Sequence, residues 1–253
     1  MAHIVASGAG KVLMARRDDP THDYILALTG KPRPRVLFVG TATGDELEYT
    51  LSFYTTYDSD RCAPHHLTLF HRDIDDLAGF VRGFDVIHVG GGNTANMLDV
   101  WRRQAFDTIL RELWEDSDVV FTGGSAGGIC WFEGGTTDSY GPTLRVLPEG
   151  LGFLRGSFCP HYDAEDQRQP LFHRALRSGE LPPGYAVGNL QSLHFDGQRF
   201  VRAISPVEHP LALRVYADAG EIVETPLESV VLTDAATARD LASASVGQRR
   251  ADR

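Results

Sequence analysis

The residues with the clearest chemical potential lie in a glycine-rich segment at positions 121–128. It reads Phe-Thr-Gly-Gly-Ser-Ala-Gly-Gly and contains the pattern G-x-S-x-G with Ser125 at its centre. An apolar run typical of a buried strand precedes it, and a second apolar stretch, 129–132, could start a helix after it. This context favours a nucleophile elbow, in which a sharp turn exposes the serine Oγ beside a helix N-terminus. The alternative is a turn in which Ser125 only caps the helix.

A serine nucleophile needs a base, because its free hydroxyl is too weakly acidic at neutral pH. The chain contains ten histidines, and His161 follows an apolar run and a proline 36 residues after Ser125. That position predicts a strand end on the same sheet edge as the elbow, although His194 is an equal candidate from sequence alone. The cluster of histidines at 65–71 has no carboxylate or cysteine partner at metal-ligand spacing. We therefore predict neither a metal nor a cofactor.

A second glycine-rich turn, Gly90 to Thr94, could supply the backbone donors that an acyl-transfer intermediate needs. It follows the apolar run 85–89, so we expect it at the end of a neighbouring strand. The N–H groups of Gly91 and Gly92 are candidates for an oxyanion hole, with Ala126 N–H as a further donor. A phosphate cradle is the alternative, but the G-x-G-x-x-G pattern is incomplete and no lysine follows as in a P-loop.

Composition limits the classes of partner. The chain has 253 residues and a formal net charge of −10, which disfavours binding to nucleic acid or to anionic membranes. No apolar run approaches the ~20 residues of a membrane span, and the N-terminus lacks the basic start and apolar core of a signal peptide. Three scattered cysteines suggest no disulfide framework. We predict a cytoplasmic protein, a monomer or homodimer, that acts on a small molecule.

Short apolar runs closed by glycine alternate with helix-like segments, of which Glu46 to Tyr57 and Thr94 to Leu113 are the clearest. This alternation predicts an α/β fold with a mostly parallel sheet between two helical layers. The stretches 192–198, 211–215 and 222–224 predict further strands, antiparallel near the C-terminus. We expect one domain over residues 1–232. Residues 233–253, rich in Ala, Ser, Arg and Asp, are expected to form a flexible tail.

Three motifs together resemble the peptidase E (aspartyl dipeptidase) family. They are the turn at 90–94, Gly-Ser-Ala-Gly at 124–127 and Pro-His-Tyr at 160–162, in the order that the family has them. Relatives of that family include cyanophycinase and the class I glutamine amidotransferase-like folds. The resemblance implies a three-layer α/β/α sandwich and a serine hydrolase in which Ser125 attacks and His161 takes the proton.

The resemblance also shows one departure. The family's orienting acid falls at Asn189 in this chain, and an amide accepts a hydrogen bond from imidazole without stabilising its positive charge as a carboxylate does. Asp138 matches a second region where the family has an acidic residue, and it is the best replacement acid. The alternative for Asp138 is a loop-capping role.

Substrate contacts are expected from three further residues. Arg168 matches the arginine that reads the Asp side chain in aspartyl dipeptidases, and its guanidinium suits a carboxylate; Asn93 and Thr94 of the second turn are expected nearby. The first hypothesis is a serine peptidase acting on short peptides, including those with N-terminal Asp. The alternatives are an amidohydrolase for a non-peptide amide and a catalytically weakened ligand-binding homologue.

Overall fold

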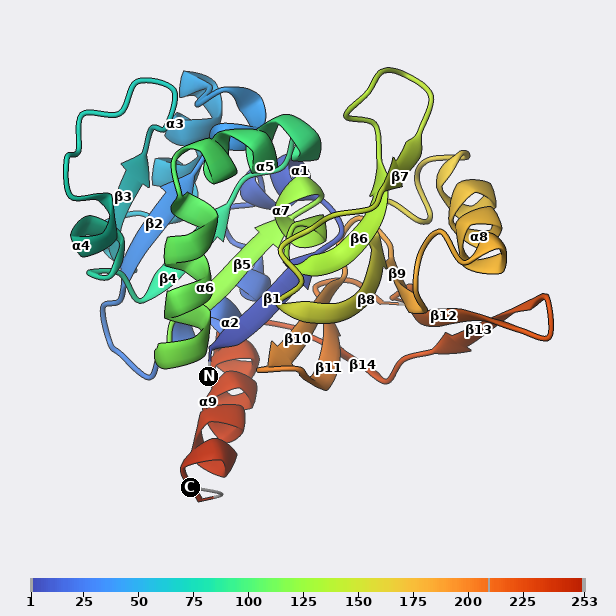
Figure 1. Cartoon of the computed structure of the whole chain (residues 1–253). Coiled ribbons are helices and arrows are strands. Elements are labelled where there is room, and N and C mark those ends of the chain that lie inside the picture. Colours follow the sequence, from blue (N-terminus) through green and yellow to red (C-terminus); the bar gives the residue numbers. More distant parts are fainter. Residues whose placement is uncertain (1, 209, 252–253) are drawn as a thin grey trace.

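The computed structural model describes residues 2–208 and 210–251, with the side chains of 248–251 excepted. Two β-sheets and the helices around them make up the molecule (Figure 1). In the described part of the chain, no helix is long and apolar enough to cross a membrane.

The first sheet has eight strands in the order β14-β11-β10-β1-β5-β4-β2-β3. Its strands are β1 (His3–Ser7), β2 (Arg35–Val39), β3 (Ala63–Leu67), β4 (Val86–Val89), β5 (Val120–Gly124), β10 (Ser192–Asp196), β11 (Arg199–Ser205) and β14 (Ser229–Val231). The five strands from β1 to β3 in this order are parallel, and β10 joins β1 in the antiparallel sense. The predicted mostly parallel sheet with antiparallel additions is confirmed.

Side chains that alternate along the parallel strands divide the core into two layers. In β2, Leu37 and Val39 join one apolar cluster, whereas Val36 and Phe38 join the other. The first cluster includes α5 and α6, and the second includes α2 and α3. Because both faces of a parallel sheet must be covered, this alternation produces the three-layer, flavodoxin-like sandwich. The helices are α1 (Gly10–Met14), α2 (Pro20–Ala27), α3 (Leu47–Thr56), α4 (Leu77–Val81), α5 (Thr94–Arg103), α6 (Phe106–Asp116), α7 (Ala126–Ile129), α8 (Arg168–Ser178) and α9 (Ala235–Ala251).

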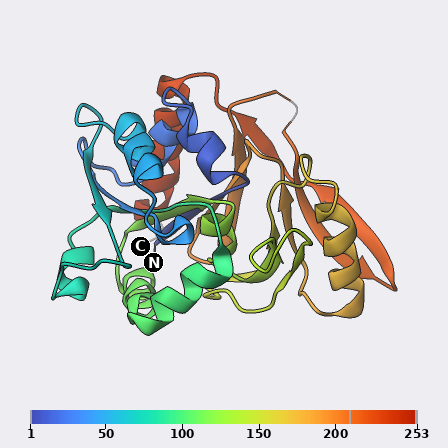
Figure 2. The ribbon, with the colours of Figure 1, turned by 90° about the horizontal axis from the view of Figure 1, so that it is seen from above.

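The second sheet was not foreseen from the sequence. It has six strands in the order β13-β12-β9-β8-β6-β7. They are β6 (Phe132–Thr137), β7 (Arg145–Leu147), β8 (Leu154–Cys159), β9 (Gly184–Val187), β12 (Ala212–Asp218) and β13 (Glu221–Pro226). Helix α8 packs on this sheet through Phe172 and Ala175. Figures 1 and 2 place the second sheet and α8 at the opposite end of the molecule from β3 and α4.

Two predicted helices differ from expectation. The segment Thr94–Leu113 forms two helices, α5 and α6, which separate at Ala105, where φ is +54°. The helix after the elbow, α7, has four residues, and the chain enters β6 at Phe132. The spacing of apolar residues indicates which face of a helix is buried. This spacing hardly changes when a single residue leaves the helical conformation, so it does not reveal the turn at Ala105.

The C-terminal segment also differs from the expected flexible tail, because Ala235–Ala251 form helix α9. Ala238 and Ala242 are fully buried in the cluster that contains α2. Small side chains on one helix face let two helices approach closely. Leu241 and Val246 of α9 pack, partly buried, against the same cluster. Figure 1 shows α9 at the lower end of the molecule, beside α2.

Candidate active site

Ser125 lies at the carboxyl end of β5, where the chain turns into α7. Its backbone has φ +55° and ψ −116°, a region that L-residues rarely adopt. The N–H of Ser125 donates to the carbonyl of Ser7 at 3.1 Å, which holds the turn against β1. A Cβ at Gly127 would lie 2.2 Å from the carbonyl oxygen of Val89. The motif glycine is therefore required for the close approach of α7 to β4.

His161 follows β8 and reaches Ser125 from the second sheet. Its Nε2 lies 2.9 Å from Ser125 Oγ, and its Nδ1 lies 2.6 Å from Asn189 Oδ1. With the proton on Nδ1, His161 donates to Asn189 Oδ1, and Nε2 accepts the hydroxyl proton of Ser125. The serine, histidine and asparagine are thus arranged as nucleophile, base and orienting group.

The other sequence candidate for the base, His194, lies elsewhere. It is fully buried within β10. Its Nε2 lies 3.0 Å from His3 Nδ1, and its Nδ1 lies 2.8 Å from the Tyr24 hydroxyl. These contacts place His194 in the buried core. Its strand, β10, lies on the opposite side of β1 from β5, the strand that leads to Ser125.

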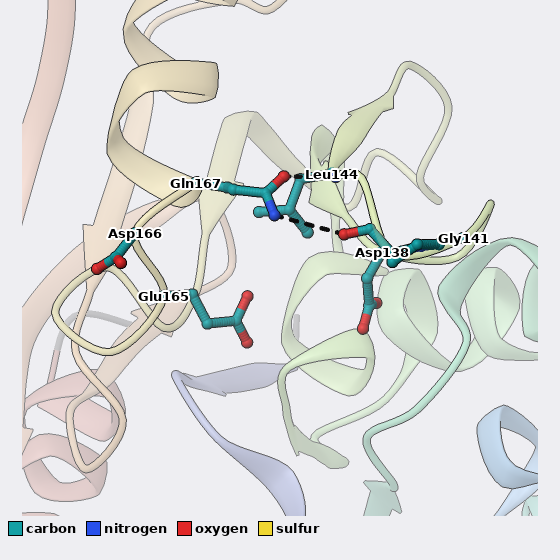
Figure 3. Close-up of a pocket in the computed structure, with 7 residues that line it drawn as sticks. Asp138, Gly141, Leu144, Glu165, Asp166 and Gln167 are labelled. Carbon is teal, nitrogen blue, oxygen red and sulfur yellow. Dashed lines mark hydrogen bonds between the residues drawn. The ribbon is translucent and has the colours of Figure 1, made fainter.

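Asp138 does not take the orienting position, because Asn189 occupies the hydrogen bond to His161 Nδ1. The Asp138 side chain lines a cavity of about 520 Å³ between the β6–β7 loop and the segment that leads into α8. Figure 3 shows Asp138 and Glu165 on its two sides, with Gln167 bonded to Leu144 N at 3.1 Å. The sequence hypothesis that Asp138 replaces the missing acid is therefore not met by this geometry.

The predicted set of oxyanion donors has to be changed at Gly91. Its N–H donates to the buried Tyr49 hydroxyl at 3.2 Å, so it is already engaged. The turn still adjoins the nucleophile, since a Cβ at Gly91 would lie 3.4 Å from Ser125 Cβ. In the described part of the chain, the N–H groups of Gly92 and Ala126 donate to no protein acceptor. These two amides remain as the pair that can bind an oxyanion.

Asn93 and Thr94 serve the fold at the start of α5. The Oδ1 of Asn93 accepts from Asn96 N at 2.9 Å as the helix N-cap, and its Nδ2 donates to the Ser139 carbonyl at 2.9 Å. Thr94 is buried. Their expected contact with substrate is therefore not supported, and their position instead links the glycine turn to the β6–β7 loop.

Arg168 differs most from expectation. Its side chain is 2% exposed, and Nε donates to Glu165 Oε2 at 2.7 Å. A terminal nitrogen, NH1, donates to the carbonyl and hydroxyl oxygens of Thr136 at 2.6 and 3.2 Å. A guanidinium that is buried and bonded inside the protein is not presented to a substrate carboxylate. Arg168 joins the start of α8 to β6.

The cysteines near the site are structural. Cys159, at the end of β8, accepts a hydrogen bond from Thr136 Oγ1 at 3.1 Å, and burial raises the pKa of its thiol to about 12. Burial raises the pKa of Cys130 well above its ordinary value. Thiols that stay protonated at neutral pH are poor nucleophiles. The described residues also contain no group of three His, Cys, Asp or Glu side chains that could hold a metal ion.

Two further residues at the site escaped the sequence analysis. Tyr49 of α3 accepts from Gly91, and nothing in the helical pattern of α3 indicates that contact. Asp163 lies two residues after His161 and accepts from the N–H of Asn189 at 3.2 Å. A carboxylate so close to the candidate base in sequence is a signal that could have been used.

The fold and this site define a three-layer α/β protein with a serine–histidine pair at the carboxyl edge of a parallel sheet. The model of peptidase family S51 matches residues 4–203, so the chain belongs to this family. The uncharacterized peptidase YgaJ of Bacillus subtilis (strain 168) is 42% identical over 227 residues, which cover 90% of this chain and 97% of YgaJ.

Solved structures agree with the fold. A candidate peptidase E from Listeria monocytogenes EGD-e superposes with a TM-score of 0.56 at 16% identity, covering 85% of this chain and 98% of that one. A peptidase from an acI-B1 Actinobacterium gives a TM-score of 0.60 at 16% identity, covering 89% and 97%. At this identity the likeness concerns the fold alone. Family membership and the named relative together indicate a peptidase.

Proposed function

We propose that this chain is a serine peptidase that hydrolyses short peptides through an acyl-enzyme on Ser125. The observation that carries the proposal is the continuous contact from Ser125 Oγ to His161 Nε2, at 2.9 Å, and from His161 Nδ1 to Asn189 Oδ1, at 2.6 Å. Such contact lets the histidine take the serine proton while its ring stays fixed in one tautomer. The strained backbone of Ser125 is a further support.

The reaction follows from these positions. Ser125 Oγ attacks the scissile carbonyl carbon, its proton passes to His161 Nε2, and the N–H groups of Gly92 and Ala126 stabilise the oxyanion. The intermediate then collapses, the C–N bond breaks, and His161 returns the proton to the leaving amine. A water molecule repeats these steps on the acyl-enzyme and releases the acid product with a free Ser125.

The substrate class is a short peptide. The resemblance to aspartyl dipeptidases points to an N-terminal Asp, but the arginine that would read its carboxylate, Arg168, is engaged with Glu165 and Thr136. A preference for N-terminal Asp would therefore need another cation at the site. A panel of chromogenic aminoacyl substrates with acidic, neutral and basic residues measures that preference directly.

A fluorophosphonate probe tests the mechanism without knowledge of the natural substrate. We expect covalent labelling of the wild type, none in Ser125→Ala, and strongly slowed labelling in His161→Ala. Absence of labelling in folded wild type would favour the ligand-binding homologue instead. Labelling without turnover of any peptide would favour the amidohydrolase for a non-peptide amide.

A further inference from the structure

We propose that Asp163 is a positioning residue for the Ser125–His161 pair: it fixes Asn189 through the backbone and brings a carboxylate to a site whose orienting side chain is neutral. The inference rests on the proposed serine mechanism and adds a residue to it. It is carried by two hydrogen bonds, from Asn189 N to Asp163 Oδ1 at 3.2 Å and between His161 Nδ1 and Asn189 Oδ1 at 2.6 Å.

Asn189 needs such a partner because it lies in a short turn between β9 and β10. The turn is closed by one backbone bond, from Gln191 N to the Gly188 carbonyl at 3.2 Å, and Asn189 is only half buried. Its side chain can hold the imidazole only if its own backbone is held. The Asp163 carboxylate meets that need, because it takes the N–H of Asn189 itself.

The loop that carries His161 and Asp163 is docked on the same strand end. The N–H of Tyr162, between the two residues, donates to the Val187 carbonyl at the end of β9, at 3.0 Å. The carbonyl of His161 accepts from Ala164 N and Glu165 N, each at 3.1 Å, so the loop is a tight turn. One rigid turn therefore presents the imidazole to Ser125 and the carboxylate to Asn189.

The chain leaves room for this carboxylate at Gly188. A Cβ at position 188 would lie 2.4 Å from Asp163 Oδ2 and 2.2 Å from Gln191 Oε1, so both side chains would have to shift away from the turn. The residue before the orienting asparagine must therefore be glycine if Asp163 is to approach the turn. The close packing is a second feature, independent of the hydrogen bonds, that places Asp163 against Asn189.

Charge explains why the pair is Asp163 with Asn189 rather than two acids. The imidazolium that forms during catalysis gains from a negative charge nearby, which the amide of Asn189 does not provide. A carboxylate at both positions would put two like charges in neighbouring turns. Of the two other carboxylates of this loop, Glu165 is neutralised by Arg168 at 2.7 Å, and Asp166 lines the cavity beside Asp138. Among the described residues Asp163 forms no ion pair, so its charge is not cancelled by a bound cation.

The test exchanges the two side chains. Three variants, Asp163→Asn, Asn189→Asp and the double variant with both changes, are compared with the wild type in the rate and the concentration dependence of fluorophosphonate labelling. Asp163→Asn keeps an Oδ1 that can accept the N–H of Asn189 but removes the negative charge. It should lower the maximal labelling rate roughly 10-fold, with half-saturation within about 2-fold, because the imidazolium that forms in the chemical step loses the nearby carboxylate. The double variant restores a single carboxylate at the direct position and should regain most of that loss.

Asp73→Asn, an exposed and distant change of the same kind, is the control and should label as the wild type does. Equal melting temperatures for Asp163→Asn and wild type show that the fold is intact. The inference is overturned by an Asp163→Asn variant that labels within 2-fold of wild type, or by a double variant no faster than Asp163→Asn. A wild type that does not label at Ser125 overturns the serine mechanism itself, which is a separate result.

Discussion

At the residue scale, the unusual member of the site is Asn189, because a neutral amide stands where serine hydrolases usually have an acid. The structure assigns it the contact with His161 Nδ1 and leaves Asp138 lining the cavity across from Glu165. The sequence left Asn189 and Asp138 as two candidates for the group that orients His161, and only Asn189 contacts the imidazole in the structure. Their roles can be separated by mutation.

Asn189→Ala should lower kcat about 10- to 100-fold, since the imidazole loses the acceptor that holds its tautomer and orientation. Asp138→Asn should keep kcat within about 2-fold of wild type, because its carboxylate does not contact His161. Steady-state kinetics on the best chromogenic peptide measures both. The reverse ranking would mean that Asp138 reaches the histidine in the working enzyme.

Arg168 illustrates a role that a motif alone cannot assign. Arg168→Ala should leave the relative rates on Asp, neutral and basic N-terminal substrates unchanged. It should also destabilise the fold by about 2 kcal/mol, because the buried oxygens of Thr136 lose their donors. Arg174→Ala, an exposed arginine on the same helix, is the matched control and should leave Tm unchanged. A selective loss of Asp substrates in Arg168→Ala would restore the recognition role.

How far the site was predictable depends on the kind of information each residue carries. The elbow and the histidine each follow an apolar run, so local patterns reveal both strand ends. The expectation that they share one sheet edge is wrong, because β5 and β8 lie in different sheets, and their meeting depends on how the two sheets pack. The contact between Tyr49 and Gly91 joins residues 42 positions apart and leaves no trace in either segment. Burial of Arg168 likewise depends on how α8 meets β6, which a single sequence does not encode locally.

At the element scale, the parallel sheet was predictable and the second sheet was not. Runs such as 36–39 are apolar on both faces, which is typical of buried parallel strands. By contrast, β6 and β8, of six residues each, are in register at three positions only, with a shift between Phe132 and Gly134. Their sequences carry several glycines, which weaken the period-2 signal on which strand assignment depends.

Helix α9 could not be predicted from the composition of its segment either. Its fully buried positions, Ala238 and Ala242, are alanines, which have high helix propensity but contribute little to an apolar pattern. The close packing against α2 predicts that Ala242→Leu destabilises the protein by roughly 1–3 kcal/mol through overpacking. Thermal denaturation should show a Tm several degrees lower. Ala244→Leu, on the exposed face, should leave Tm unchanged, and equal effects of the two variants would contradict the packing of α9.

At the scale of the whole molecule, two buried histidines couple stability to pH. His88 lies among the rings of Phe38, Phe53 and Tyr57, and burial lowers its pKa to about 3, with a smaller contribution from His22. Burial also lowers the pKa of His22 to about 4, against the opposing effect of Asp19. Both side chains are therefore neutral in the folded protein at pH 6.5, where half of the unfolded chains would carry the proton.

The sign follows from proton binding. Between pH 6.5 and about 4 the unfolded state binds more protons at these two histidines than the folded state does, so stability falls as the pH is lowered through this range. Each histidine contributes a slope of up to about 1.4 kcal/mol per pH unit. The His88 share can be isolated, because Nδ1 of this side chain has no hydrogen-bond partner in the described residues and leucine can replace it without leaving a buried donor or acceptor.

His88→Leu should therefore reduce the slope of unfolding free energy against pH by about 1 kcal/mol per unit between pH 6 and 4. Urea denaturation at four or five pH values in this range measures the slope, which does not depend on any constant change in stability from repacking among the aromatic rings. His71→Leu removes an exposed histidine and is the matched control, which should leave the slope unchanged. Equal slopes of unfolding free energy against pH for His88→Leu and wild type would show that protonation of His88 does not cause the loss of stability at low pH.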